Sequence, residues 1–181
     1  WLFTKRGGTE GIVGFVRALA RSTDTFFYKI GEMTGPVEIG RWAKKFGLGV
    51  KTGISLPGEV EGLIATPTWK ERVKGERWFL GNTYHMAIGQ GDVLVTPLQI
   101  NVMTNALATG GNKCRPHLAK IPNSKFQDPN KAQCSNVQIS SETLETIKEG
   151  MVEACSEGGT AFPLFDWNAG ARKGLPHSAF A

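Results

Sequence analysis

Apolar side chains recur at helical spacing in several separate stretches of the chain. The pattern predicts helices over residues 11–20, 25–33, 36–46, 96–109 and 141–155, with a further helix beginning at Thr66-Pro67-Thr68-Trp69. Glycine and proline punctuate residues 51–63, which we expect to form a strand or a loop, and residues 113–139 are typical of a strand, a loop and a second strand. The chain is therefore expected to have a mixed α+β fold in which helices dominate.

The helix predicted over residues 96–109 has the clearest start and stop signals. Thr96 can cap it, and Pro97 suits its first turn because the missing N–H would be unpaired there anyway. Gly110-Gly111-Asn112 ends it and favours a tight turn into a strand. Apolar residues cover much of the circumference, so we expect this helix to be buried. Just before it, Gly89 and Gly91 flank Gln90 and indicate a turn with positive φ angles.

Composition narrows the class of protein. The 181 residues are 40% hydrophobic and 20% charged, which is ordinary for one globular domain or a piece of a larger one. The net charge of +5 comes from scattered lysines and arginines without a basic stripe, so a nucleic-acid partner is not expected. The chain opens at Trp1 and ends at Ala181 within an apolar run, and we expect it to be a fragment of a longer protein.

Cysteine and histidine give no sign of a metal centre. Cys114, Cys134 and Cys155 form no Cys-x-x-Cys pair, and an odd number cannot close a set of disulfides, so we expect them to be small buried hydrophobic residues. The histidines, His85, His117 and His177, are isolated in the sequence and are expected to be structural. Neither a metal nor an organic cofactor is expected.

Ser22-Thr23-Asp24 lies between two predicted helices. Serine and aspartate at such a junction are most often helix caps. The same residue types can also carry out acid–base chemistry when they face a cleft. The residues alone favour the cap.

A longer pattern identifies a family that the chain resembles. Ile88-Gly89-Gln90-Gly91, followed by Val95-Thr96-Pro97-Leu98-Gln99, resembles a signature of the class B penicillin-binding proteins, and in particular of the elongation-type penicillin-binding protein 2. The resemblance runs from about Gly14 to Ala181. It implies a β-lactamase/transpeptidase-like fold, of which residues 1–181 would be part of the transpeptidase domain: a helical subdomain and part of a mixed sheet.

The resemblance also assigns roles to the Ser22-Thr23-Asp24 segment. Ser22 matches the serine of the family's Ser-x-Asn motif, which relays protons to the leaving group, and Asp24 stands where the family usually has asparagine. A carboxylate at that place would hold a nearby lysine protonated and weaken it as a base. Thr23 and His177 would contact the substrate.

Two further motifs of the family are expected to lie elsewhere. Lys51-Thr52-Gly53 resembles the catalytic Lys-Thr/Ser-Gly triplet, but it precedes the Gly89-Gln90-Gly91 segment, whereas the catalytic triplet follows it, so we interpret it as a decoy. No Lys-Thr-Gly or Lys-Ser-Gly lies between Gly158-Gly159-Thr160-Ala161 and His177, where only Lys173-Gly174 occurs, and a stretch near residues 168–172 is expected to be missing. No serine is followed three residues later by lysine; the acylating Ser-x-x-Lys would precede Trp1.

The resemblance implies a serine D,D-transpeptidase that cross-links peptidoglycan stem peptides and is acylated by β-lactams. The expected location is the extracytoplasmic side of a bacterial inner membrane, with an anchor outside this sequence and a membrane glycosyltransferase of the elongation machinery as a possible partner. The fragment alone is expected to be inactive. Two alternatives stay open: a non-catalytic β-lactam sensor or pseudoenzyme of the same fold, and a helical interaction module whose glycine turns only mimic the family.

Overall fold

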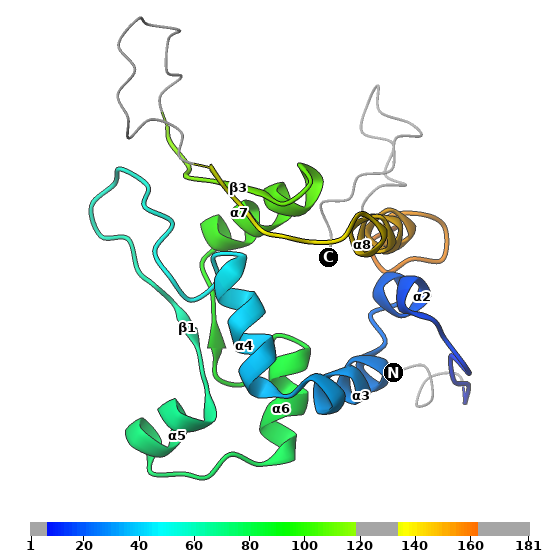
Figure 1. Ribbon diagram of the computed structural model, residues 1–181. Helices are drawn as coiled ribbons and strands as arrows, with labels where there is room; N and C mark the ends of the chain where they lie inside the picture. Colours follow the sequence, from blue (N-terminus) through cyan, green and yellow to red (C-terminus); the bar gives the residue numbers. More distant parts are fainter. Residues whose placement is uncertain (1–6, 119–133, 163–181) are drawn as a thin grey trace, which may run out of the picture. The chain divides into compact units, whose positions relative to one another are not determined.

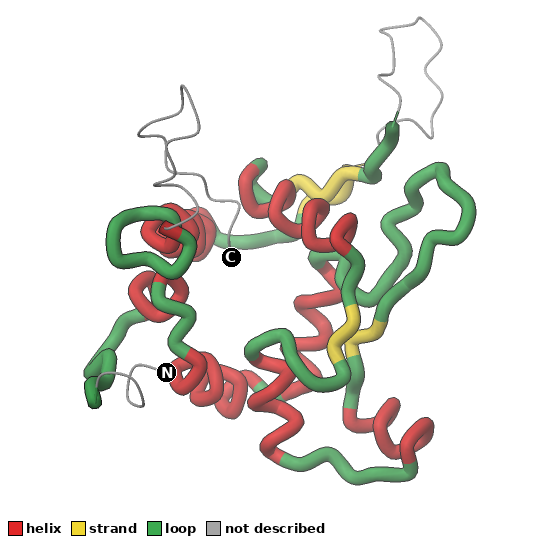
Figure 2. Tube along the Cα trace, turned by 180° about the vertical axis from the view of Figure 1, so that it is seen from behind, coloured by secondary structure: helices red, strands yellow, loops and turns green. Residues whose placement is uncertain are grey.

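A computed structural model describes residues 7–118 and 134–162. Helices make up most of the regular secondary structure in these ranges, and the strands are short (Figures 1 and 2). The chain forms two compact units: the first contains the chain up to Lys29 and from Ser140 onward, and the second runs from Ile30 to Ile139. Within the described ranges, no helix combines the length and the apolar character needed to cross a membrane.

The first unit is built on the packing of α2 (Phe15–Ala20) against α8 (Ser141–Ala154). The two helices approach closely because α8 carries Gly150 at the contact, where an added Cβ would come within 2.7 Å of the Leu19 side chain. Arg17 and Glu153 join the same helices through an ion pair of 3.2 Å. At its start, α8 is capped by Ser140, whose hydroxyl accepts the Thr143 N–H.

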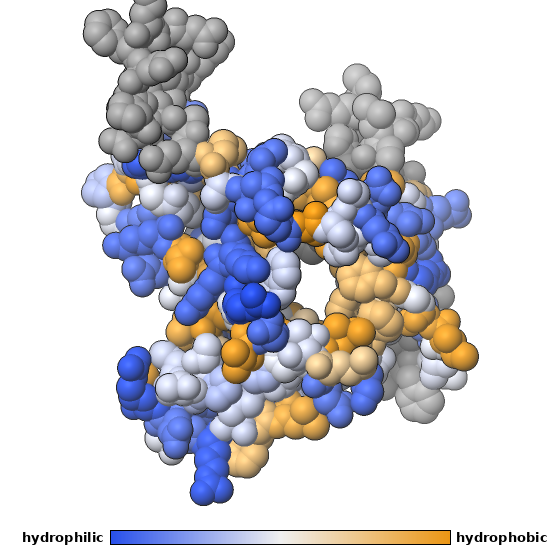
Figure 3. Space-filling view, viewed as in Figure 1, coloured by the Kyte–Doolittle hydropathy of each residue, from blue (hydrophilic) through white to orange (hydrophobic). Residues whose placement is uncertain are grey.

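The next two helices, α3 (Asp24–Thr34) and α4 (Pro36–Lys45), meet at a sharp joint. Gly35 occupies it with a φ of 79°, a value that glycine adopts without steric cost, and Pro36 opens α4. The exposed side chains of α4 are mostly hydrophilic (Figure 3), with Val37 as an exposed apolar exception, and the last turn is basic through Lys44 and Lys45. Positive charge at a helix C-terminus stabilises it, and the Lys113 ammonium adds to this by donating to the Lys45 carbonyl at 2.9 Å.

The second unit also holds α5 (Pro67–Lys74), α6 (Leu80–Ala87) and α7 (Pro97–Ala108), together with the paired strands β1 (Leu63–Ile64) and β2 (Val93–Leu94). The strands run antiparallel, with Leu63 opposite Leu94 and Ile64 opposite Val93. Thr66 ends the link from β1 by capping α5, since its hydroxyl accepts the Trp69 N–H at 3.2 Å.

One fully buried polar side chain, Gln99, ties this unit together. Its amide nitrogen donates to the carbonyl oxygens of Val50 at 2.7 Å and of Glu61 at 2.8 Å, and its amide oxygen accepts the Thr96 N–H at 3.0 Å. The Thr96 hydroxyl in turn accepts the Gln99 N–H, which completes a capping box at the start of α7. Every hydrogen-bonding direction of the amide group but one is therefore used, and one side chain holds a helix and two distant backbone segments.

The loop between those two segments is organised by a single carboxylate. Glu59 accepts hydrogen bonds from the Thr52 N–H at 2.6 Å, the Thr52 hydroxyl at 2.5 Å and the Gly53 N–H at 3.1 Å. These donors hold the pKa of Glu59 below its ordinary value; the Thr52 hydroxyl has the largest effect, the two backbone N–H groups and the charge of Lys51 act in the same direction, and burial opposes them.

The strands β3 (Asn112–Cys114) and β4 (Cys134–Asn136) form the other antiparallel pair and correct the prediction about the cysteines. Cys114 lies directly opposite Cys134, with 4.0 Å between the Cα atoms, and the two form a disulfide. The odd count was misleading because Cys155 is separately buried at the end of α8, as predicted for all three. Arg115, which directly follows β3, donates to the Gly53 carbonyl and, at 3.2 Å, to the Ser55 hydroxyl.

Most of the predicted elements are present, with shifted ends. The helices expected over 25–33, 36–46, 96–109 and 141–155 are α3, α4, α7 and α8, and Gly89 and Gly91 have the positive φ values expected of their turn. The helix expected over 11–20 begins only at Phe15, and α6 and β2 were not predicted. Helix α7 is buried along one side through Gln99, Val102, Ala106 and Leu107, but Ile100 is exposed.

We predict that Gln99→Glu destabilises the protein by about 3–5 kcal/mol. The substitution keeps the size of the side chain but replaces the donating amide with an acceptor that faces the Val50 and Glu61 carbonyls in a buried place. Urea unfolding measures the change. The matched control is Gln90→Glu, because Gln90 lies exposed in the neighbouring turn and should cost less than about 0.5 kcal/mol. Equal losses for the two variants would show that the buried amide has no special role.

A second prediction concerns the pH dependence given by Glu59. Because its folded pKa lies below the unfolded value near 4.5, Glu59 stabilises the fold above that pH, and the contribution is lost as the pH falls through the folded pKa. The free energy of unfolding of Glu59→Gln should therefore be lower than that of the unsubstituted protein at neutral pH, and the two should converge on acidification. Glu61→Gln, at an exposed side chain of the same loop, is the control. A difference that persists undiminished in acid would contradict the assignment.

Candidate functional site

The Ser22-Thr23-Asp24 segment forms the turn between α2 and α3. The Ser22 N–H donates to the Leu19 carbonyl at 3.2 Å and the Thr23 N–H to the Ala18 carbonyl at 2.9 Å, the hydrogen-bond pattern of a Schellman motif at the end of α2. Glycine is favoured where such a motif turns left-handed, yet Ser22 occupies that position, with a φ of 50°. A left-handed conformation costs a residue with a Cβ about 1–2 kcal/mol, so the backbone is strained at Ser22.

The segment that follows α8 holds this turn in place. The Thr160 N–H donates to the Ala20 carbonyl at 3.0 Å, and the Thr160 hydroxyl lies 3.2 Å from the same oxygen and 3.4 Å from the Ser22 hydroxyl. The guanidinium of Arg21 donates to the Gly158 carbonyl at 2.5 Å. The two ends of this first unit, far apart in sequence, are thus joined at Ser22.

A groove opens in front of the turn. Its lining comes from the irregular segment before α2, from the turn itself and from the segment after α8: residues 8–13, 21–26 and 159–160. Ser22 and Asp24 are both exposed to it, while Ile12, Val13 and Phe26 give it an apolar wall. Glu10 and Arg21, both in the lining, form an ion pair at 3.1 Å, whereas Asp24 adds a separate carboxylate at the turn.

The cap that the residues alone favoured is only partly present. Thr23, rather than Ser22, immediately precedes α3, and its carbonyl accepts the Phe26 N–H at 3.0 Å. Asp24 lies in the first turn of α3, where a negative charge stabilises the positive end of the helix dipole. Among the described residues the buried hydroxyl of Thr23 has no hydrogen-bond partner. The Ser22 hydroxyl does not cap α3 but lies against the Thr160 hydroxyl.

The other candidate residues do not join this turn. Lys51-Thr52-Gly53 lies in the second unit, in a loop and not on a strand, with Thr52 bound by Glu59. His177, Lys173-Gly174 and the stretch near 168–172 lie outside the described residues. Over the ranges that the structure describes, no group of three or more potential metal ligands occurs together.

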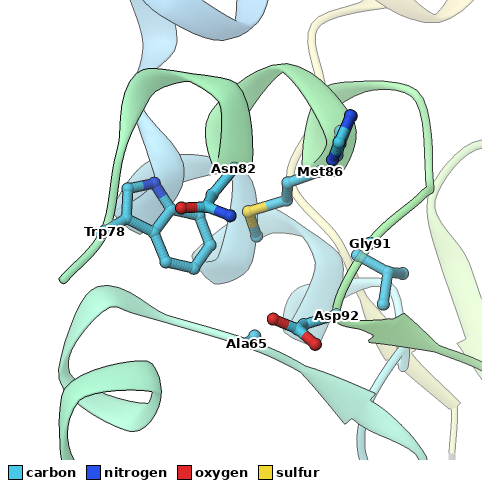
Figure 4. Close-up of a pocket in the computed structure, with 8 residues that line it drawn as sticks. Ala65, Trp78, Asn82, Met86, Gly91 and Asp92 are labelled. Carbon is cyan, nitrogen blue, oxygen red and sulfur yellow. The ribbon is translucent and has the colours of Figure 1, made fainter. Parts of the chain in front are cut away.

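A second, smaller pocket lies beneath α6 in the second unit (Figure 4). Asn82 and Met86 extend from α6 toward Asp92, with Trp78 at one end and Gly91 at the other. The Asp92 carboxylate accepts a 2.5 Å hydrogen bond from Lys74, which raises the pKa of that lysine. The pocket holds about 30 Å³, room for one or two water molecules, so it cannot bind a peptide.

Sequence reasoning found the turn but missed what holds it. The signal available in the sequence was the Gly158-Gly159-Thr160 step, because its glycines favour close backbone contact. That step does not say which distant segment is contacted.

Comparison with known proteins gives consistent matches. The peptidoglycan D,D-transpeptidase MrdA of Acinetobacter baumannii is 39% identical over 111 residues, which are 61% of this chain and 16% of that protein. A solved penicillin-binding protein, PBP2 from Helicobacter pylori, matches with a TM-score of 0.75 and 32% identity over 85% of this chain and 28% of the other. A chain from a structure on polymerization and crosslinking by a peptidoglycan synthase complex matches with a TM-score of 0.70 and 32% identity over 86% of this chain and 26% of the other.

The chain thus spans about a sixth of the curated relative's length. The names MrdA and PBP2 confirm the resemblance to penicillin-binding protein 2. The solved structures confirm the mixed transpeptidase fold, and not the alternative of a purely helical interaction module. The family model for the penicillin binding protein transpeptidase domain matches residues 4–169. By this match, which covers nearly all of its residues, the chain belongs to the transpeptidase domain family of the penicillin-binding proteins.

Proposed function

We propose that this chain is part of a serine D,D-transpeptidase that cross-links peptidoglycan stem peptides, and that Ser22 is its proton-relay serine. The observation that carries the proposal is the Ser22 turn: a hydroxyl held in a left-handed conformation, exposed to a groove and secured by a distant segment. Strain of this kind persists where the surrounding structure supports it, and it is concentrated at functional sites. The curated relative is named for the same reaction.

The acylating serine would lie outside the 181 residues, since none of their serines has a lysine three positions on. In the complete enzyme that serine attacks the carbonyl of the D-Ala-D-Ala bond, the leaving amine takes up a proton, and an acyl-enzyme forms that a second amine resolves. Ser22 would pass the proton between the lysine of Ser-x-x-Lys and the leaving amine. Asp24 would face the same lysine. Thr23 and His177 would contact the substrate.

Lys51-Thr52-Gly53 is proposed to be structural. Its threonine hydroxyl and two of its backbone N–H groups are used to bind Glu59, and the Gly53 carbonyl is bound by Arg115. Because these polar groups are already hydrogen-bonded within the protein, they are not free to bind a substrate.

Partners and location follow from the same proposal. Peptidoglycan stem peptides would be the substrates, β-lactams the covalent inhibitors, and a membrane glycosyltransferase a partner; one similar chain comes from a structure that concerns both polymerization and crosslinking. The cell envelope is the location implied by penicillin-binding relatives. The Cys114–Cys134 disulfide supports an oxidising, extracytoplasmic compartment.

We predict that Ser22→Ala and Ser22→Gly in the complete enzyme both slow acylation by labelled penicillin, by roughly 10²–10⁴-fold, because both remove the relay hydroxyl. Their stabilities should differ: Ser22→Gly should be more stable than Ser22→Ala by about 1 kcal/mol, since only glycine adopts a positive φ without strain. Stopped-flow acylation and urea unfolding of each variant give the two quantities.

Lys51→Ala is the control and should leave the acylation rate within about twofold of the unsubstituted enzyme. A cap without a catalytic role would give the opposite result for Ser22, with lower stability of about 1 kcal/mol in Ser22→Ala and normal acylation. That result would show that Ser22 is a structural residue of the turn and not a proton relay.

A further inference from the structure

We infer that Thr160 is a positioning residue that orients the hydroxyl of Ser22 for its proposed relay. The inference rests on the proposed function. Nothing in the Ser-x-Asn pattern points to Thr160, which lies 138 residues away in the sequence. Its hydroxyl nevertheless lies against both Ser22 and the end of α2.

The hydrogen bonds of the Thr160 hydroxyl have a defined direction. A threonine hydroxyl carries one proton, and the Ala20 carbonyl can only accept, so the 3.2 Å contact between them must be donated by Thr160. That proton is then not available for Ser22. In the 3.4 Å contact between the two hydroxyls, Ser22 is therefore the donor and Thr160 the acceptor. With its proton turned toward Thr160, the lone pairs of Ser22 are left to accept a proton or a hydrogen bond from a group in the groove.

The Thr160 hydroxyl is not needed to complete the hydrogen bonding of α2. The last carbonyls of the helix all have donors from the backbone: Arg17 from Arg21 N–H, Ala18 from Thr23 N–H, Leu19 from Ser22 N–H and Ala20 from Thr160 N–H. The Ala20 oxygen stays paired when the Thr160 side chain loses its hydroxyl. The specific effect of the Thr160 hydroxyl is therefore on the hydroxyl of Ser22.

The backbone around Thr160 is held in place by close contacts. An added Cβ at Gly159 would come within 2.2 Å of the Ala154 carbonyl, so only glycine permits this close contact with the end of α8. The Ala161 N–H donates to that same carbonyl at 2.9 Å. Thr160 is thus held between α8 on one side and α2 on the other, and its hydroxyl has a defined place from which to orient Ser22.

The test compares Thr160→Val with Thr160→Ser in the complete enzyme. Valine keeps the shape and removes the hydroxyl, whereas serine keeps the hydroxyl and removes a methyl group. We expect Thr160→Val to lower the limiting acylation rate with labelled penicillin about tenfold, with the half-saturating concentration unchanged, and Thr160→Ser to restore the rate to within about threefold of the unsubstituted enzyme. Should Thr160→Val not fold, Thr160→Ala removes the same hydroxyl.

Thr146→Val is the matched control, since the Thr146 hydroxyl also donates to a backbone carbonyl, that of Glu142 at 2.8 Å, but lies on α8 away from Ser22. It should not change the rate. A double-mutant cycle adds a second readout: in a Ser22→Ala background, Thr160→Val should have no further effect, because Thr160 acts through the Ser22 hydroxyl.

A Thr160→Val rate within twofold of the unsubstituted enzyme would overturn the inference while leaving the proposed function intact. So would an equal loss in Thr160→Ser, which indicates a packing role, or additive losses in the double variant. Failure of the unsubstituted enzyme to be acylated at all would overturn the proposed function, and the inference with it.

Discussion

The buried amide of Gln99 is the interaction on which the second unit depends. Secondary structure there is sparse around residues 50–62, so the backbone groups of that loop need partners from elsewhere. Gln99 supplies them at Val50 and Glu61 while it also caps its own helix. Glu59 then organises the loop between the two anchored points. A satisfied polar network of this kind fixes one arrangement of the backbone, because each alternative leaves a buried group unpaired.

In the first unit, the backbone groups at the end of α2 also need hydrogen-bond partners from a distant segment. The helix ends in a left-handed serine, and the segment after α8 closes on it through Thr160 and Gly159. Gly150 allows α8 to approach Leu19 closely enough for this closure. The placement of Ser22 is thus a result of helix packing. The elements that hold the candidate relay hydroxyl in place are structural, and they contribute no catalytic motif of their own. The proposed role of Ser22 and the stability of the unit would therefore depend on the same few contacts.

Local signals in the sequence were sufficient for the long helices and for the turn at Gly89 and Gly91, because caps and glycine breaks act over a few residues. Helix α6 was missed since its apolar positions are few and Gly81 weakens its propensity. The disulfide could not be predicted because it depends on the register of β3 and β4. At the site, the resemblance pointed to Ser22 and Asp24, whereas Thr160 depends on a contact across the chain that no local pattern encodes.

The central claim is that this chain carries a relay serine and not the nucleophile. Peptide mapping of the complete enzyme after reaction with labelled penicillin tests it most directly. We expect the label on the serine of a Ser-x-x-Lys segment outside these 181 residues, and no covalent adduct on the 181-residue chain alone in an intact-mass measurement. Label on Ser22, or on any other serine of this chain, would contradict the account.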